Sequence, residues 1–220
     1  MTAPTTIPIR SESLAEWASK APPHEKEVVL HMHYHYREQL SAARFAIPLA
    51  QPAGIAAGIN EVIDGAVERQ LTSKQGRKVT CRRGCSACCH LHVTITEPEA
   101  KLALLEAADA GWQIDTERAR LQAQAGSVEA WGELRDEQRA CIFLTPAGLC
   151  AIYQHRPGAC RKYMVVSPPA ECDSIRRPGH KVAQLIAVEA EVMFNAALDV
   201  FPSGTLPAMV LAELEKESAQ

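Results

Sequence analysis

Hydrophobic positions in the first third of the chain recur with helical spacing. Ser13 and Glu16 form a capping box and predict a short helix that the two prolines at 22–23 end. Residues 24–46 contain no helix breaker and predict a second helix. A third helix, ending near residues 73–76, is predicted by apolar residues with a 3.6-residue period: Ile55, Ile59, Val62, Ile63, Ala66 and Val67. This part of the chain has no cysteine, so we expect it to act as a scaffold.

Helical patterns return after a segment that has no period. Residues 81–92 show neither helical nor strand spacing, and residues 93–96 form a short strand at most. Thr96 and Glu99 make a second capping box and predict a helix that Gly111 closes. Further helices are predicted at 115–125, 128–139, 181–200 and 205–216, whereas 141–173, rich in proline and glycine, predicts loops.

The elements together predict a mainly α fold with a cysteine-rich, irregular loop core between N- and C-terminal helices. The 220 residues, 47% of them hydrophobic, suffice for one domain with its own core. Within that domain, 1–220, we expect a helical scaffold at 1–76, a metal-binding core at 77–178 and C-terminal helices at 179–220.

Charge and hydropathy exclude several classes of protein. The net charge of -3 and pI of 6.2 make nucleic acid an improbable partner. Residues 1–10 lack the apolar core of a secretory signal, and polar residues interrupt the longest apolar stretch, 182–198, so we expect no membrane span. The expected location is the cytoplasm, where clustered cysteines bind metals more often than they form disulfides. No nucleophile elbow, P-loop or dinucleotide-binding turn is present.

Eight cysteines carry the candidate chemistry. Four form a dense C-x3-C-x2-C-C motif, and four more follow at uneven spacing: Cys81, Cys85, Cys88 and Cys89, then Cys141, Cys150, Cys160 and Cys172. Thiolates packed so closely repel one another and bind soft or borderline metals strongly. The first three also have the spacing with which radical-SAM enzymes hold an iron–sulfur cluster, although the barrel pattern of those enzymes is missing. We expect all eight to be metal ligands on loops that converge.

The motifs around the cysteines resemble those of a known family. Cys81-x3-Cys85-x2-Cys88-Cys89 is followed by CIFL from Cys141, by GLCAIY from Gly148 and by RPxxCR from Arg156. This order resembles the YkgJ-type family of zinc- or iron-chelating domains, over about residues 81–172. That family is distantly similar to part of flagellin lysine N-methylase, which is described with an iron–sulfur cluster and a methyl-transfer role.

Three functions stay open. The leading one is a metal-binding protein that holds an iron–sulfur cluster, which we favour, or zinc, with redox or storage duty. The alternatives are an iron–sulfur-dependent protein-modifying enzyme such as a methyltransferase, and a zinc-stabilised interaction module. Besides the metal ion or cluster, an anionic small molecule or a protein substrate is the expected partner.

Charged and imidazole side chains near the cysteines are further candidates. Arg156 and Arg161 bracket Cys160, and we expect them to support the cysteine sulfurs or to bind an anion. His90 or His92 can replace a cysteine as ligand. The alternating trio His31, His33 and His35 predicts a polar helix face, since only the first and last share a side of the helix.

Overall fold

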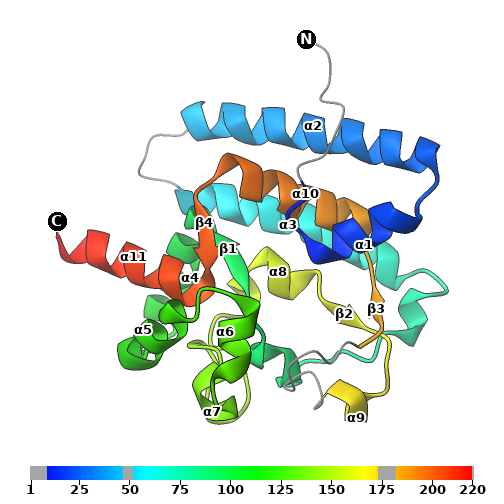
Figure 1. Ribbon diagram of the computed structural model, residues 1–220. Helices are drawn as coiled ribbons and strands as arrows, with labels where there is room; N and C mark the ends of the chain where they lie inside the picture. The colour runs from blue at the N-terminus through cyan, green and yellow to red at the C-terminus, as the bar shows by residue number, and fades with distance from the viewer. Residues whose placement is uncertain (1–8, 47–51, 173–181, 220) are drawn as a thin grey trace.

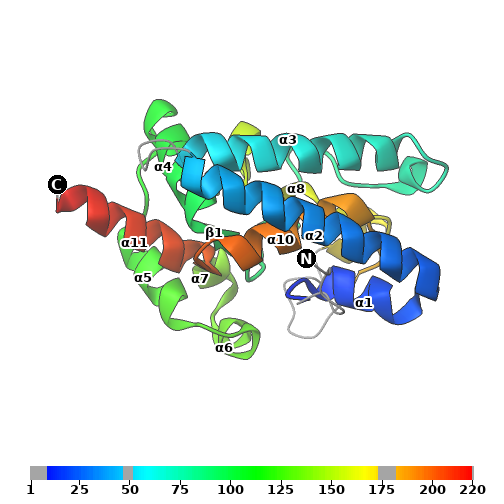
Figure 2. The same ribbon diagram turned by 90° about the horizontal axis from the view of Figure 1, so that it is seen from above.

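Four helices form the upper layer of the molecule. The computed structural model describes residues 9–46, 52–172 and 182–219. Helix α2 (Pro23–Ala46) crosses the top, with α10 (Val188–Val200) and α3 (Pro52–Leu71) beneath it and the short α1 (Glu12–Lys20) at one end (Figure 1). Seen from above, α2 and α3 run in roughly the same direction (Figure 2), and α10 packs against both. The first three helices and α10, which are far apart in the sequence, therefore share one layer.

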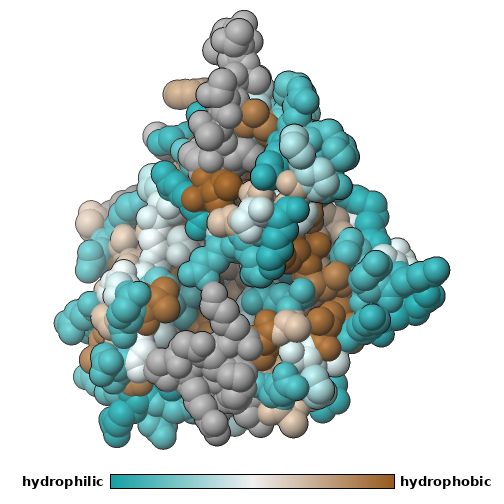
Figure 3. All heavy atoms as spheres, turned by 45° about the vertical axis from the view of Figure 1, so that its right-hand side comes forward, coloured by the Kyte–Doolittle hydropathy of each residue, from teal (hydrophilic) through white to brown (hydrophobic). Residues whose placement is uncertain are grey.

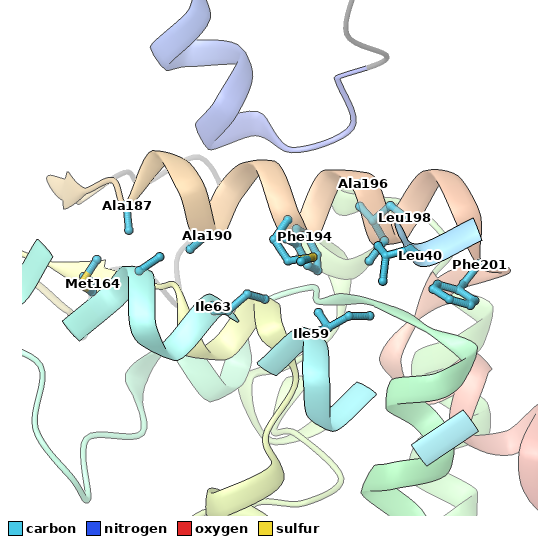
Figure 4. Close-up of a cluster of buried hydrophobic side chains, with 13 residues drawn as sticks. Leu40, Ile59, Ile63, Met164, Ala187, Ala190, Phe194, Ala196, Leu198 and Phe201 are labelled. Atoms are coloured by element: carbon cyan, nitrogen blue, oxygen red, sulfur yellow. The ribbon is translucent and has the colours of Figure 1, made fainter. Parts of the chain in front are cut away.

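The core of this layer lies between α10 and its two neighbours. Phe194 and the small side chain of Ala190 point from α10 toward Ile59 and Ile63 of α3, and all four are buried (Figure 4). Alanines on α10 let the helix backbones approach closely, and the burial of the large apolar side chains stabilises the contact.

A second layer lies below and holds the remaining long helices. Helix α4 (Glu97–Asp109) packs against α3, and α11 (Leu206–Ser218) packs on α4 and α5 (Thr116–Gln124). Strand β1 (Thr94–Thr96) pairs antiparallel with β4 (Ser203–Thr205), with Ile95 opposite Gly204. These strands bring the starts of α4 and α11 together, and a buried cluster that includes Ile142, Phe143 and Ile152 joins the later cysteine loop to them.

Short elements connect the cysteines to these layers. They are η1 (Gly76–Lys78), η2 (Ala87–His90), α6 (Val128–Glu133), α7 (Asp136–Arg139), η3 (Tyr153–His155), α8 (Gly158–Arg161), β2 (Met164–Val165), α9 (Pro169–Cys172) and β3 (Gln184–Leu185). Strand β2 pairs antiparallel with β3, Met164 opposite Leu185. The predicted fold class is confirmed: the protein is mainly α, one domain, with irregular cysteine loops between N- and C-terminal helices.

Most predicted helices are found, with one difference at the first. The elements predicted at 24–46, from Ile55, after Thr96, at 115–125 and at 205–216 correspond to α2, α3, α4, α5 and α11. Helix α1, however, is capped by Ser11, whose hydroxyl accepts from the N–H of Leu14 at 3.3 Å, so Ser13 is not the cap. Ser11 is buried against α10 and donates to Glu191, a contact that local sequence does not reveal.

Two helix predictions need correction. The predicted helix at 128–139 is divided into α6 and α7, because Leu134 and Arg135 have extended backbones. Of the helix predicted at 181–200, Lys181 lies outside the described residues, and the helix begins at Val188. The residues before it form β3, because β2 offers their backbone groups hydrogen-bond partners across the sheet. The loop-rich stretch after Cys141 also contains the single-turn helices α8 and α9.

The surface at one end of the upper layer contains a groove of about 580 Å³. It lies between α1, α2, α3 and the start of α10, and Val28, 60% exposed, stands at its edge. Figure 3 shows this side of the molecule, where hydrophobic residues gather between hydrophilic ones. In the described ranges, no helix has the length and apolar character that a membrane crossing requires.

Candidate metal centre

The first cysteine loop is fixed to β2. Thr80 donates its backbone N–H to the carbonyl of Val165 at 2.8 Å, and Val165 donates its own N–H to the Cys81 sulfur at 3.2 Å. Gly84 has a φ of +87°, in the left-handed region, which allows the tight turn before Cys85. Cys81 and Cys85 are both exposed.

The second half of this loop meets the later cysteines through the backbone. Cys88 and Cys89 lie on η2, and Cys141 donates its N–H to the carbonyl of Cys89 at 2.8 Å. The indole N–H of Trp131 on α6 donates to the carbonyl of His90 at 2.9 Å. The two cysteine groups, 52 residues apart in the chain at this point, are therefore held side by side.

Cys141 and Cys150 lie on the two arms of one turn. Leu144 and Cys150 form an antiparallel bridge, and Ala151 donates its N–H to the carbonyl of Phe143 at 2.9 Å. In both arms the N–H of the residue two positions later donates to the cysteine sulfur: Phe143 to Cys141, and Ile152 to Cys150. Such bonds lower the thiol pKa because they stabilise the thiolate.

The short helix that carries Cys160 is anchored by a buried carboxylate. This helix is α8, whose first residue, Gly158, donates its N–H to Glu99 at 2.8 Å. The other oxygen of Glu99 accepts from the N–H and hydroxyl of Thr96 at 2.7 and 2.8 Å. A Cβ at Gly158 would lie 2.6 Å from the Cδ1 methyl of Ile63 on α3, so any larger residue would require that side chain to shift.

Four cysteines act on one another electrostatically; we call Cys88, Cys141, Cys150 and Cys160 the cysteine tetrad. Each of its six pairs is coupled, so that ionisation of one thiol raises the pKa of the other. Burial is the largest cause of the raised pKa of Cys141, to about 12, and of Cys160, well above its usual value. For Cys88 the largest cause is a hydrogen bond with the Cys89 thiol, followed by burial. Thiols from three separate segments thus influence one another's ionisation.

Three other cysteines line a pocket of about 380 Å³; we call Cys81, Cys85 and Cys172 the pocket cysteines. The pocket is also lined by Thr80, Arg82 and Ser86. Cys172 is buried at the end of α9. Tyr163 connects the two sets, since its pKa, raised to about 12 mainly by burial, is raised further by Cys88, Cys172 and Cys81.

The chain was compared with known proteins. Residues 80–178 match the family model CxxCxxCC, described as "Putative zinc- or iron-chelating domain". That segment contains all eight cysteines. This match supports the cysteine-cluster family that the motifs around the cysteines resemble. No curated protein and no solved structure matches the chain.

The donor chemistry of the CxxCxxCC segment fits zinc or iron. Eight sulfurs are available, all eight cysteines lie among the described residues, and none of them forms a disulfide. In the positions that the structure describes, no group of three or more His, Cys, Asp or Glu side chains is arranged to hold a metal ion. Burial raises the pKa of these thiols, and backbone N–H donors to sulfur and a nearby guanidinium offset part of that effect in favour of the thiolate that a metal needs.

The two candidate arginines of the CxxCxxCC segment have different surroundings. The guanidinium of Arg156 lies 4.2 Å from the ring centre of Tyr153, and its charge lowers the pKa of Cys81 and of three members of the tetrad, Cys88, Cys150 and Cys160. Arg161 is buried and donates to the carbonyls of Arg156, at 2.7 Å, and Gln154, while it pairs with Asp64 of α3. Arg161 thus holds the turn that presents Arg156.

The two imidazole candidates, His90 and His92, pack against neighbouring protein groups. His90 is buried with its Nδ1 3.3 Å from the carbonyl of Ser86, and His92 packs edge-on against Trp131. Burial lowers the pKa of His92.

Of the α2 trio, His31 and His35 are exposed, as a polar helix face requires, but His33 is completely buried. The Nε2 of His33 lies 3.3 Å from Asp199 and 3.3 Å from Asn195. Sequence reasoning missed His33 and Glu99 as buried polar residues; the capping box was the one signal for Glu99.

Proposed function

We propose that this protein binds an iron–sulfur cluster through its cysteine tetrad, with zinc as the alternative metal. The CxxCxxCC segment is of a type described as zinc- or iron-chelating, and the chain has eight cysteines. The observation that carries the proposal is the backbone contact between the two cysteine groups, in which Cys141 donates its N–H to the carbonyl of Cys89 at 2.8 Å. The four tetrad thiols, which come from η2, from the turn after α7 and from α8, also raise one another's pKa. Four thiolates supply the ligand set of a four-iron cluster or of one tetrahedral zinc ion.

The surroundings of the sulfurs support a cluster. The N–H groups of Phe143 and Ile152 donate to two of the sulfurs, and Arg156 places a positive charge near three of them. Hydrogen bonds to sulfur and nearby charge are means by which proteins stabilise iron–sulfur clusters and tune their reduction potentials. When bound, the cluster would supply one-electron chemistry. The pocket cysteines and Cys89 stay candidate ligands beside the tetrad.

The pocket gives a reason to keep an enzyme as the second candidate. A fully closed metal site is typical of a structural module, whereas here a pocket of about 380 Å³ lies beside the cysteines. Its volume falls at the lower end of the range for small-molecule sites. A cluster-dependent protein-modifying enzyme, such as a methyltransferase, would use such an opening; a zinc-stabilised interaction module would not need it.

Serine variants test the ligand assignment. Cys141→Ser with Cys160→Ser removes two soft ligands from the tetrad, so we expect metal and acid-labile sulfide to be lost after anaerobic purification. Cys85→Ser, at an exposed thiol outside the tetrad, tests the pocket cysteines separately: full metal content in this variant would confine the ligands to the other cysteines. Full metal content in the double variant, together with an unchanged circular dichroism spectrum, would refute the assignment.

A further inference from the structure

Three arginines lie on or beside the first cysteine loop. Arg82 lines the pocket, and Arg83 is next to it in the chain. Arg83 lies 5.6 Å from the ring centre of Tyr153, and Arg156 lies 4.2 Å from the same ring centre. The two guanidinium groups, which repel each other, are thus held at one aromatic ring.

The local backbone fixes this arrangement. Arg156 begins a stiff segment because Pro157 follows it, and the buried Arg161 binds the carbonyls of Gln154 and Arg156. On the other loop, the tight turn through Gly84 follows Arg83 directly, because the φ of Gly84 lies in the left-handed region. The backbone positions from which Arg83 and Arg156 reach Tyr153 are therefore fixed by the fold.

The charges of these arginines are not neutralised by carboxylates of the described residues. Among the ion pairs in the described ranges, none includes Arg82, Arg83 or Arg156. Like charges that are held together without acidic partners attract an anion, and planar guanidinium groups suit the paired oxygens of a phosphoryl or carboxylate group.

We propose that Arg82, Arg83 and Arg156 form a binding site for a small oxyanion at the mouth of the pocket beside the cysteines. The pocket of about 380 Å³ has room for a small molecule that carries phosphoryl or carboxylate groups. Ser86 in the pocket lining offers its hydroxyl group to the same ligand, whereas the hydroxyl of Thr80 already donates to the carbonyl of Ser167. The site stands on the positions of the arginines, so it does not depend on which metal the tetrad binds.

Calorimetric titration of the protein as purified, with pyrophosphate in one series and citrate in another, tests the site. We expect saturable binding of one anion per chain that weakens as salt is added. Arg83→Gln with Arg156→Gln should weaken binding on the order of 10- to 100-fold, the scale of one to two charge-assisted hydrogen bonds. Arg77→Gln, an exposed arginine of the preceding segment, is the control and should bind like the wild type.

Tyr153 separates a built site from general charge attraction. Tyr153→Phe keeps the ring and should leave the affinity unchanged, whereas Tyr153→Leu removes the ring that both arginines contact and should weaken binding several-fold at unchanged metal content. Preference for pyrophosphate over citrate, or the reverse, identifies the ligand class. The proposal is overturned if the wild type binds neither anion, if the double variant binds as tightly as the wild type, or if Arg77→Gln weakens binding equally.

Discussion

Glu99 couples the helical scaffold to the cysteine loops, and its removal should be costly. Glu99 is 3% exposed and accepts three hydrogen bonds, from two groups of Thr96 and from the N–H of Gly158. In Glu99→Ala the hydroxyl of Thr96 can rotate, but two buried N–H groups lose their acceptor. Each such loss costs about 1–3 kcal/mol, or about 2–6 kcal/mol for the pair.

The net effect should lie in the lower part of that range. Burial raises the pKa of Glu99, so the carboxylate itself is destabilised in the fold and its removal offsets part of the loss. We therefore expect Glu99→Ala to lower the free energy of unfolding by about 2–4 kcal/mol. Glu99→Gln keeps one oxygen acceptor and should lose about 1–2 kcal/mol. Because Gly158 precedes Cys160 on α8, metal retention should fall in the same order.

Anaerobic urea unfolding followed by circular dichroism measures these differences. Glu106→Ala is the matched control on α4. Its carboxylate lies 3.5 Å from His155 in a partly exposed pair, so the change should cost less than about 1 kcal/mol. If Glu99→Ala unfolds within about 0.5 kcal/mol of the wild type, the link from Glu99 to α8 does not stabilise the protein.

Two further predictions concern buried charges. Burial lowers the pKa of His33 below 6.5, so on acidification the unfolded chain binds a proton at a higher pH than the folded protein does, and the free energy of unfolding should fall as the pH drops below about 6.5. His33→Gln should flatten this pH dependence, and His31→Gln should not. Arg161→Ala leaves the carbonyls of Gln154 and Arg156 without their donor and should reduce metal retention, measured by competition with a chelator, on the order of 10-fold. Unchanged retention would mean that Arg161 stabilises the fold but does not support the metal site.

The helices were predictable because their signals are local. The caps and apolar periods that predicted α2, α3 and α4 involve residues within one or two turns of each other. The start of α10 was not predictable in this way. Residues 184–185 carry no breaker, and they form β3 only because β2, 20 residues earlier in the chain, lies beside them.

The site was predictable in its chemistry but not in its grouping. Cysteine spacing indicated a thiolate centre, yet nothing in the spacing selects Cys88 from its neighbour Cys89 as a partner of Cys160. That selection depends on how η2 and α8 are packed. Likewise, the capping box pointed to one oxygen of Glu99, while its contact with Gly158 spans 59 residues. Buried His33 depends on Asp199 of α10, which no local pattern places beside it.

The central claim, that the cysteines hold an iron–sulfur cluster, is tested most directly by metal and acid-labile sulfide analysis of the protein purified without oxygen, with its visible spectrum. The account predicts a brown protein that contains iron and sulfide in equal amounts, with the broad absorption of sulfur-to-iron charge transfer. A colourless protein that contains zinc and no sulfide would contradict it.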